Sequence, residues 1–300
     1  MSAGRMHADE FDIDVPLVRR LVAARFPQWA QLPVERVPSD GTSNAMFRLG
    51  DGLAVRLPLA ERMVGDVEFE HRWLPRLAPL LPVDIPVVAE KGLPTEDFPW
   101  PWSVHRWLDG ENPVAGRLTD PAGLAADLAA FIAAMRRIEL ADGPAAYRGG
   151  PLTTQDAGTR TAIGELNGII DTQAATAAWE AALKAPEWSG PPVWIHADLM
   201  PGNVLVDRGR LSAVIDFATM GVGDPACDLI PAWNLLPAQA RDPFRAAVGA
   251  DDATWARGRG RALSMALIQL PYYQHTNPGI AANARHVIRE VLADHERCPG

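Results

Sequence analysis

The stretch that most constrains the fold runs from residue 193 to residue 229, where polar side chains interrupt apolar, strand-like runs. Asp198 and Asn203 lie in and beside a Pro- and Gly-containing loop after a short β-prone run, and Asp216 lies near the end of a longer one. Carboxylates in such apolar surroundings are costly unless they bind something. We therefore expect the three side chains to meet at one site.

Two β-rich runs in this stretch, residues 204–206 and 211–217, are joined by a short Gly-containing connection, which predicts a hairpin. The hairpin would fold Asp216 back toward the loop that carries Asp198, with Asn203 at the foot of the first arm. Two carboxylates and one amide oxygen suit Mg²⁺, a hard cation that prefers oxygen ligands. The alternative is that each side chain only caps a turn or a strand end.

Three motifs of this stretch resemble the aminoglycoside phosphotransferase family of the protein-kinase-like superfamily. They are HADLMPGN at residues 196–203, IDF at 215–217 and GDPACDL at 223–229. In combination their spacing is specific, although an isolated His-x-Asp would not be. Ala197 departs from the family pattern, which usually has Gly at this position. Alanine disfavours a positive φ, but the substitution removes no chemical group from the site.

The resemblance implies a fold and a chemistry. The fold is bilobal, α+β and protein-kinase-like, with an antiparallel sheet and a helix in the N-lobe and a mostly helical C-lobe. The chemistry is phosphorylation of a small-molecule hydroxyl with ATP or GTP as co-substrate. Asp198 would accept the hydroxyl proton or orient the nucleophile, while Asn203 and Asp216 would hold Mg²⁺. Asp224 and Asp228 would brace the nearby loop, the alternative being contact with substrate.

The polar turn at residues 39–44 lies between two β-prone runs. Small residues in such a turn let backbone N–H groups approach phosphate oxygens. Taken alone the segment favours an ordinary hairpin turn. By resemblance, Thr42, Ser43 and Asn44 belong to the nucleotide loop.

Arg56 lies on the polar face of the alternating run 53–58. By resemblance it takes the place of the basic residue that holds the α- and β-phosphates, and an arginine there keeps its charge. On the helical segment 61–77, Glu70 has apolar neighbours at i−3, i+3 and i+4 and needs a cation, whereas Glu68 has more solvated neighbours. We therefore expect Glu70, and not Glu68, to pair with Arg56.

The aromatic, extended segment before Asp109 and Gly110 predicts a strand that leaves the N-terminal lobe. By resemblance it is the hinge, where main-chain groups of Val104, His105 and Arg106 bind the nucleobase. The lobes implied are 1–105, which binds nucleotide, and 106–300, which carries catalytic and substrate-binding residues.

Helical periodicity predicts most of the second lobe. The expected helices are 120–138, a polar one over 155–184, and four Ala-rich ones at 228–236, 241–248, 253–270 and 280–295. Asp156, Trp233 and Tyr272 are the expected substrate contacts on these helices. The alternatives are a solvated helix face for Asp156 and lobe packing for the two aromatic residues.

The charge balance narrows the partners. A net charge of −9, from 28 basic and 37 acidic residues, argues against nucleic-acid binding and is compatible with a cationic small-molecule substrate, although many ordinary proteins are equally acidic. The N-terminus lacks the apolar core of a signal peptide, and no run of about 18 apolar residues occurs. These features predict a cytoplasmic protein with no membrane partner.

The expected function is therefore a kinase acting on an aminoglycoside-like or other natural-product acceptor, with antibiotic resistance as the associated role. One alternative is a kinase of a small metabolite such as choline, homoserine or an amino sugar. Another is a non-catalytic, nucleotide-binding pseudokinase module, which is suggested by the departures from the kinase pattern at Arg56 and Ala197. A metal-dependent hydrolase would need further His clusters.

Overall fold

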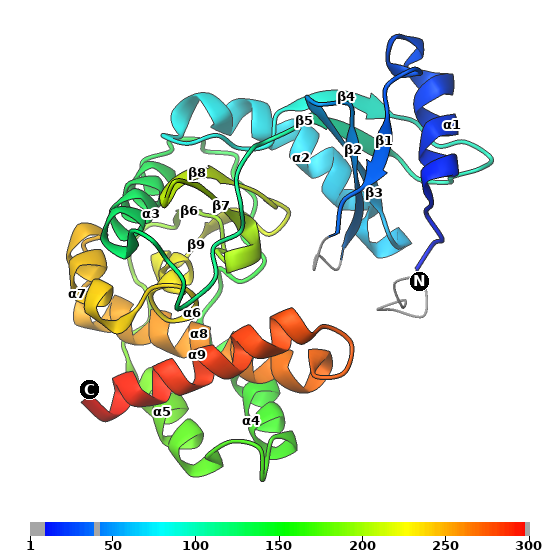
Figure 1. Ribbon diagram of the computed structural model, residues 1–300. Helices are drawn as coiled ribbons and strands as arrows, with labels where there is room; N and C mark the ends of the chain where they lie inside the picture. The colour runs from blue at the N-terminus through cyan, green and yellow to red at the C-terminus, as the bar shows by residue number, and fades with distance from the viewer. Residues whose placement is uncertain (1–9, 39–42, 298–300) are drawn as a thin grey trace. The chain divides into compact units, whose positions relative to one another are not determined.

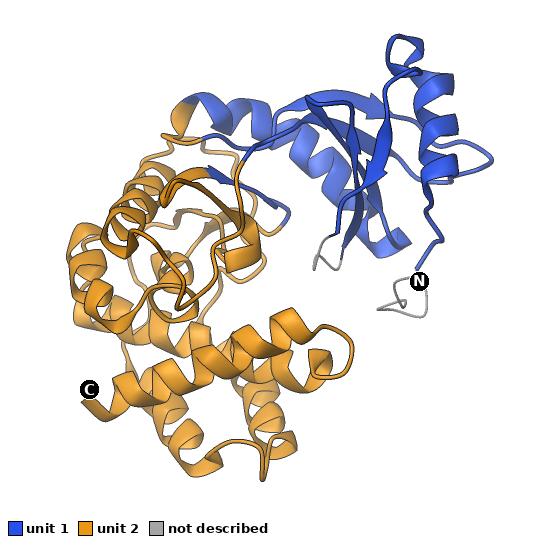
Figure 2. Ribbon diagram, in the orientation of Figure 1, with its two compact units in different colours: residues 1–79, 84–109, 213–218 blue, residues 80–83, 110–212, 219–300 orange. Residues whose placement is uncertain are grey.

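The computed structural model describes residues 10–38 and 43–297, and the chain forms two compact units (Figures 1 and 2). Unit 1 consists of residues 1–79, 84–109 and 213–218. Unit 2 consists of residues 80–83, 110–212 and 219–300. An antiparallel sheet dominates the first unit and helices dominate the second. The α+β, bilobal fold class predicted from the sequence is confirmed.

Unit 1 is built on a five-stranded antiparallel sheet with the strand order β1-β2-β3-β5-β4. The strands are β1 (Val34–Arg36), β2 (Asn44–Leu49), β3 (Leu53–Pro58), β4 (Val88–Gly92) and β5 (Trp102–Arg106). On the central strand β3, Arg56 lies opposite Met46 of β2 and Ser103 of β5. Arg56 is thus held in the middle of the sheet.

Helices α1 (Val15–Arg25) and α2 (Val64–Leu77) cover the two faces of this sheet (Figure 1). Helix α1 begins after Asp14, whose carboxylate accepts the Leu17 N–H at 2.8 Å, as an N-cap residue should. Its apolar residues pack with Phe47 and Val55 into one core. Helix α2 buries Glu70 together with its apolar stripe, so one carboxylate faces the sheet.

Unit 2 is mostly helical. Its helices are α3 (Pro121–Arg136), α4 (Asp156–Glu165), α5 (Thr172–Lys184), α6 (Pro231–Asn234), α7 (Ala238–Ala247), α8 (Asp252–Tyr273) and α9 (Pro278–Arg297). The long helix α8 packs against α4, α5 and α9 (Figure 1). Helices α3, α5 and α8 each begin after an Asp whose carboxylate accepts an N–H of the first turn. Within the described ranges, no helix is both long and apolar enough to span a membrane.

The segment 155–184 was expected to be helical throughout, but it contains two helices. Between α4 and α5 the chain turns over residues 166–171, where Gly168 has a φ of 78°. A right-handed helix cannot continue through a left-handed residue, and glycine adopts that conformation at little cost. Asp171 then caps the start of α5.

Two short sheets carry the predicted catalytic motifs. Strand β6 (Val193–Ile195) pairs antiparallel with β9 (Gly221–Gly223), and β7 (Val204–Asp207) pairs with β8 (Arg210–Val214). The expected hairpin is present, but β8 ends at Val214. Asp216 therefore lies in the irregular segment after the strand, with a φ of 63°. Strand β9 was not expected, because its Gly-Val-Gly sequence has no strand-like alternation.

Candidate active site

On unit 1, Arg56 is held between carboxylates. Its Nη1 contacts Glu70 of α2, and its Nη2 donates to Asp216 Oδ1 at 3.0 Å. Glu70 is only 1% exposed, whereas Glu68 points elsewhere and contacts Lys91. Glu70 is thus the partner of Arg56, as the helical spacing predicts.

The charges around Arg56 do not balance. Burial alone would lower the pKa of Arg56, but Glu70 and Asp216 outweigh it and raise that pKa. Asp66 adds a third carboxylate, and its pKa is raised by burial and by repulsion from Asp216, against the attraction of Arg56. One guanidinium therefore interacts with three carboxylates. Within the described residues, no group of three or more His, Cys, Asp or Glu side chains is placed to hold a metal ion.

The predicted nucleotide loop lies only partly within the described residues. Thr42 lies outside them, and the carbonyl oxygen of Ser43 accepts the Leu59 N–H at 3.0 Å. Asn44 begins β2 and is buried. With its amide oriented so that Oδ1 faces Arg56, it accepts from Nη2 at 3.0 Å and from Nε at 3.1 Å. Asn44 thereby joins the Arg56 cluster.

The three predicted hinge residues lie inside β5 rather than beyond it. Val104 pairs with a residue of β3 on one side and of β4 on the other. The amides of Arg106 and Trp107 donate to carbonyl oxygens of neighbouring segments at 2.9 Å each. The buried His105 ring lies 2.8 Å from Ser103 Oγ, and burial lowers its pKa to about 3, so it stays neutral. The main chain of these residues is therefore engaged within the sheet.

On unit 2, Asp198 lies in the loop after β6 with both carboxylate oxygens engaged. Oδ1 accepts from Arg148 Nη1 at 3.1 Å, and Oδ2 accepts from Asn203 Nδ2 at 3.0 Å. The same Asn203 nitrogen also donates to the carbonyl oxygen of Asp198 at 2.9 Å. Because the nitrogen of the Asn203 amide faces Asp198, its Oδ1 is the atom that can bind a cation.

The turn before Asp198 is strained. Ala197 has a φ of 65°, a left-handed conformation that costs roughly 1–2 kcal/mol in a residue with a Cβ. Its N–H donates to Asp228 Oδ1 at 2.8 Å, and the His196 N–H donates to Oδ2 at 2.9 Å. Burial raises the pKa of Asp228 to about 6, although these two N–H groups partly offset the rise. Asp228 thus braces the loop, as expected from the sequence, and does not serve mainly as a substrate contact.

Asp224 serves as a second internal brace. It is 5% exposed, and its carboxylate accepts from Arg257 Nε at 2.9 Å, from Arg261 Nη2 at 3.1 Å and from the Ala226 N–H at 2.9 Å. Burial would raise the pKa of Asp224, but these hydrogen bonds and charges lower it. The buried His196 also supports the loop, since its carbonyl oxygen accepts from Thr219 Oγ1 at 3.0 Å.

Two residues of this region were missed from the sequence. Arg148 reaches Asp198 from the segment between α3 and α4, and Asn112 Nδ2 donates to the carbonyl oxygens of Gly202 and Val204 at 2.9 Å each. Neither belongs to a motif. Each is a polar residue beside Gly or Pro in a segment read only as a loop. That signal is too common to single them out.

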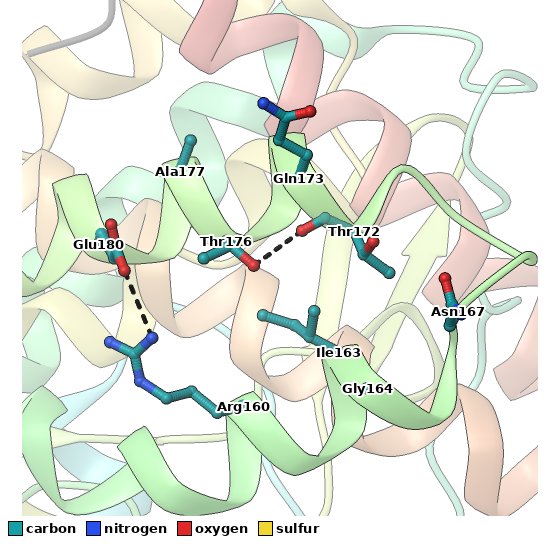
Figure 3. A pocket seen from close by; sticks show the side chains of 9 residues that line it. All are labelled: Arg160, Ile163, Gly164, Asn167, Thr172, Gln173, Thr176, Ala177 and Glu180. Atoms are coloured by element: carbon teal, nitrogen blue, oxygen red, sulfur yellow. Dashed lines mark hydrogen bonds and ion pairs between the residues drawn. The ribbon is translucent and has the colours of Figure 1, made fainter.

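The predicted substrate residue Asp156 holds other side chains. Its Oδ1 accepts from Trp179 Nε1 and from Arg160 Nε at 2.8 Å each. Arg160, also paired with Glu180, lines a groove of about 650 Å³ between α4 and α5 (Figure 3). Asp156 therefore does not line this groove and contacts it only through Arg160.

The two predicted aromatic contacts differ in exposure. Trp233 is fully buried, lies 4.7 Å from the Trp255 ring and donates to Asp294 Oδ2 at 3.2 Å, so it is a packing residue. Tyr272 is 56% exposed near the end of α8, edge-on to Tyr273. Only Tyr272 is accessible to a ligand.

Comparisons with known proteins agree with this arrangement. A family model described as the phosphotransferase enzyme family matches residues 34–263. Among solved structures, the GDP complex of an aminoglycoside 2'-phosphotransferase-IIIa F108L mutant is 18% identical, with 96% of this chain and 100% of that chain covered at a TM-score of 0.76. The GDP and kanamycin complex of APH(2")-IIIa is 18% identical, covering 92% and 98% at 0.74.

A macrolide enzyme has a similar fold. The macrolide 2'-phosphotransferase MphH from Brachybacterium faecium is 20% identical, with 92% of this chain and 98% of that chain covered at a TM-score of 0.61. No curated protein matches the chain. The structural likenesses establish the fold, and the family match spans most of the sequence, so the chain belongs to the phosphotransferase enzyme family.

Proposed function

We propose that this protein transfers the γ-phosphate of ATP or GTP to a hydroxyl group of a small molecule. The observation that carries the proposal is the loop 196–203, in which the carboxylate of Asp198 is held by Asn203 and Arg148 but stays 19% exposed. Asp198 accepts the hydroxyl proton or orients the hydroxyl for attack, and the nucleoside diphosphate leaves. Catalysis in such transfers consists mainly of positioning and charge stabilisation.

The nucleotide is assigned to the Arg56 side of the machinery. Arg56 offsets the charge of the phosphates, because its raised pKa keeps it protonated, and Glu70 fixes its guanidinium. Ser43 and Asn44, with Thr42, are the expected loop contacts. Since the amides up to Trp107 are engaged in the sheet, we assign base recognition to main-chain groups that follow Trp107.

Mg²⁺ is the metal that these residues fit. Asp216 on unit 1 and Asn203, through Oδ1, on unit 2 each offer an oxygen ligand of the kind that Mg²⁺ prefers. When bound, the ion neutralises charge on the phosphate oxygens.

The acceptor is proposed to be a natural-product antibiotic of the aminoglycoside or macrolide kind. Structural neighbours include a complex with kanamycin and a macrolide enzyme. The net charge of −9 favours a cationic acceptor, which aminoglycosides are. A small metabolite is the alternative acceptor, because fold alone does not determine substrate.

The test is a panel of acceptors with Mg²⁺ and either ATP or GTP, read by release of nucleoside diphosphate. The panel contains kanamycin, gentamicin, a macrolide, choline, homoserine and glucosamine. Wild type is compared with Asp198→Asn, expected to lose about 10²–10⁴-fold in kcat, and with Asp207→Asn, an exposed hairpin residue, as the matched control.

The outcomes separate the alternatives. Turnover of kanamycin or the macrolide that disappears in Asp198→Asn and persists in Asp207→Asn supports the proposal. Turnover of metabolites alone would replace the antibiotic acceptor with a metabolite. Tight Mg²⁺-nucleotide binding without turnover of any acceptor would identify a pseudokinase module and refute the kinase assignment.

A further inference from the structure

The proposed catalytic loop contains no positive charge of its own. Residues 196–203, HADLMPGN, include neither Lys nor Arg. The cation beside Asp198 comes instead from a segment 50 residues earlier in the sequence, as the guanidinium of Arg148. This contact needs an explanation that the loop motif does not provide.

Arg148 and Asn203 fix the carboxylate of Asp198 from two sides. The arginine holds Oδ1 at 3.1 Å and the amide holds Oδ2 at 3.0 Å. A carboxylate held at both oxygens cannot rotate freely about its terminal bond. Its remaining lone pairs therefore point in fixed directions, which is what a group that receives a hydroxyl proton requires.

The pair is better shielded than an ordinary surface ion pair. The side chain of Arg148 is 26% exposed and that of Asp198 is 19% exposed. The centroid of the exposed Tyr147 ring lies 5.3 Å from the guanidinium carbon. Water strongly screens fully exposed ion pairs, so this partial shielding strengthens the attraction between the two side chains.

The main chain that carries Arg148 is anchored by buried groups. Its carbonyl oxygen accepts from Arg261 Nη1 at 2.7 Å and from Cys227 Sγ at 3.1 Å. Arg261 also donates to the carbonyl oxygen of Gly150 at 2.6 Å and is itself paired with the buried Asp224. A residue anchored in this way presents its side chain from a fixed base, unlike an arginine on a flexible loop.

The side chain of Arg148 makes few contacts besides the one to Asp198. Its only other contact to the main chain within the described residues is to the Ala197 carbonyl oxygen at 3.5 Å, which is too long for a strong hydrogen bond. The loop itself is braced by Asp228, which holds two N–H groups. The contact of Arg148 with the carboxylate is thus its main interaction.

We propose that Arg148 is a positioning residue for phosphoryl transfer, holding the Asp198 carboxylate in the orientation that receives the acceptor proton. The proposal rests on the proposed function, since it takes Asp198 as the proton acceptor. It assigns a role to a residue outside the family motifs. The role is to set kcat, while the nucleotide is bound elsewhere in the chain.

The test uses water as the acceptor, so that no substrate needs to be known. Mg²⁺-dependent ATP hydrolysis is measured for wild type, Arg148→Met, Arg148→Lys, Asp198→Asn and the double variant Arg148→Met/Asp198→Asn. Arg210→Met is the matched control, because Arg210 makes an exposed ion pair with Asp127 on the same unit. We expect Arg148→Met to lose about 100-fold in kcat with KM for ATP within about twofold of wild type.

Two further results are expected if the role is positional. Arg148→Lys recovers part of kcat, because an ammonium group can still reach the carboxylate. The double variant is no worse than Asp198→Asn alone, since residues that act as a unit are not additive. An unchanged or increased kcat in Arg148→Met, or a loss seen mainly in KM and not rescued by lysine, would overturn the proposal.

A second measurement does not depend on turnover. Hydrogen–deuterium exchange at the amides of residues 197–203 is expected to stay at the wild-type level in both Arg148→Met and Arg210→Met, because Asp228 braces the loop. A several-fold rise in Arg148→Met would show that the arginine holds the loop itself and would overturn the proposal. Equal hydrolysis by wild type and Asp198→Asn would refute the proposed function and, with it, the positional role of Arg148. Hydrolysis that depends on Asp198 but is unchanged in Arg148→Met would refute the positional role alone.

Discussion

At the scale of single residues, the buried carboxylate of Asp228 shows how the fold holds a strained turn. Ala197 adopts a positive φ that glycine would take more easily. The Asp228 carboxylate compensates by accepting both N–H groups of the turn, although burial raises its pKa to about 6. A protonated carboxyl group would lose one of these acceptor positions. The charged Asp228 carboxylate therefore holds both N–H groups of the loop, but keeping it ionised in a buried position lowers the free energy of unfolding.

This cost gives activity and stability opposite dependences on pH. The pKa of Asp228 rises from 3.8 to about 6 on folding, so its contribution to the free energy of unfolding is fully present below pH 3.8. That contribution is lost as pH rises through 6, and the difference is roughly 3 kcal/mol. Below about pH 6, protonation of Asp228 should instead weaken its hold on the loop 196–203 and reduce the ATP hydrolysis that depends on Asp198.

The variant Asp228→Asn isolates both effects. We expect it to have low activity at every pH and to lack the acid limb near pH 6 that wild type shows. Relative to wild type, its free energy of unfolding in urea should improve by up to about 3 kcal/mol between pH 4 and pH 7. Asp207→Asn serves as the exposed control. A stability difference that does not vary with pH would contradict the assignment.

Residue-scale prediction succeeded where local pattern decides the answer. Glu70 could be chosen over Glu68 because the helical spacing alone places it on the buried face of α2. Arg148 could not be found, because its contact with Asp198 depends on how two loops 50 residues apart are folded together. The aromatic pattern left Trp233 undecided between cleft and core, since a buried ring and an exposed ring have the same sequence signal.

At the scale of elements, the segment 144–150 packs closely against β9, and this close approach depends on Gly221 of β9. Val222 donates its N–H to the Pro144 carbonyl oxygen at 2.7 Å and accepts the Ala146 N–H at 3.0 Å. A Cβ on Gly221 would lie 2.4 Å from that same carbonyl oxygen of Pro144. Main-chain atoms cannot move aside as a flexible side chain can. Glycine at residue 221 is therefore required for the close approach.

Replacing Gly221 should disturb both stability and the position of Arg148. We expect Gly221→Ala to lower the free energy of unfolding by about 1–3 kcal/mol, the usual cost of overpacking. Because the displaced segment carries Arg148, ATP hydrolysis should fall as well. The control is Gly150→Ala in the same segment, where a Cβ would have no atom within 4 Å. Equal stability of the two variants in urea would refute this account.

Elements with strong local periodicity were predictable and those defined by distant partners were not. Helices α1, α3 and α8 have caps and apolar stripes in their own sequences, and β3 alternates cleanly. Strand β9 exists because β6 offers it an edge, which no local pattern reveals. The break between α4 and α5 had a local signal in Gly168, but a single glycine inside a polar helical pattern is tolerated often enough to be overlooked.

At the scale of the whole molecule, each unit has a buried interior of its own. Phe47 is fully buried within unit 1, and Phe131 is fully buried within unit 2. Stability need not be uniform in such a chain, because regions can open separately. Mutations in the two interiors should then be distinguishable by where the chain opens.

A matched pair of substitutions tests this. Phe47→Ala and Phe131→Ala should each cost about 3–5 kcal/mol, because each removes a buried aromatic ring. Hydrogen exchange should increase first within unit 1 for the former and within unit 2 for the latter. If either substitution raised exchange equally throughout the chain, the two units would have to unfold as one cooperative body.

The ion pair between Arg56 and Asp216 joins residues far apart in the sequence, which affects when it can form during synthesis and whether it survives a gene fusion. The two residues are 160 positions apart, and residues 213–218 join unit 1 from within the stretch that otherwise builds unit 2. During synthesis on the ribosome, Arg56 can meet Glu70 early but must wait for most of the chain before Asp216 emerges. A gene fusion that exchanged residues 1–109 as a block would likewise take the arginine from one parent and the aspartate from the other.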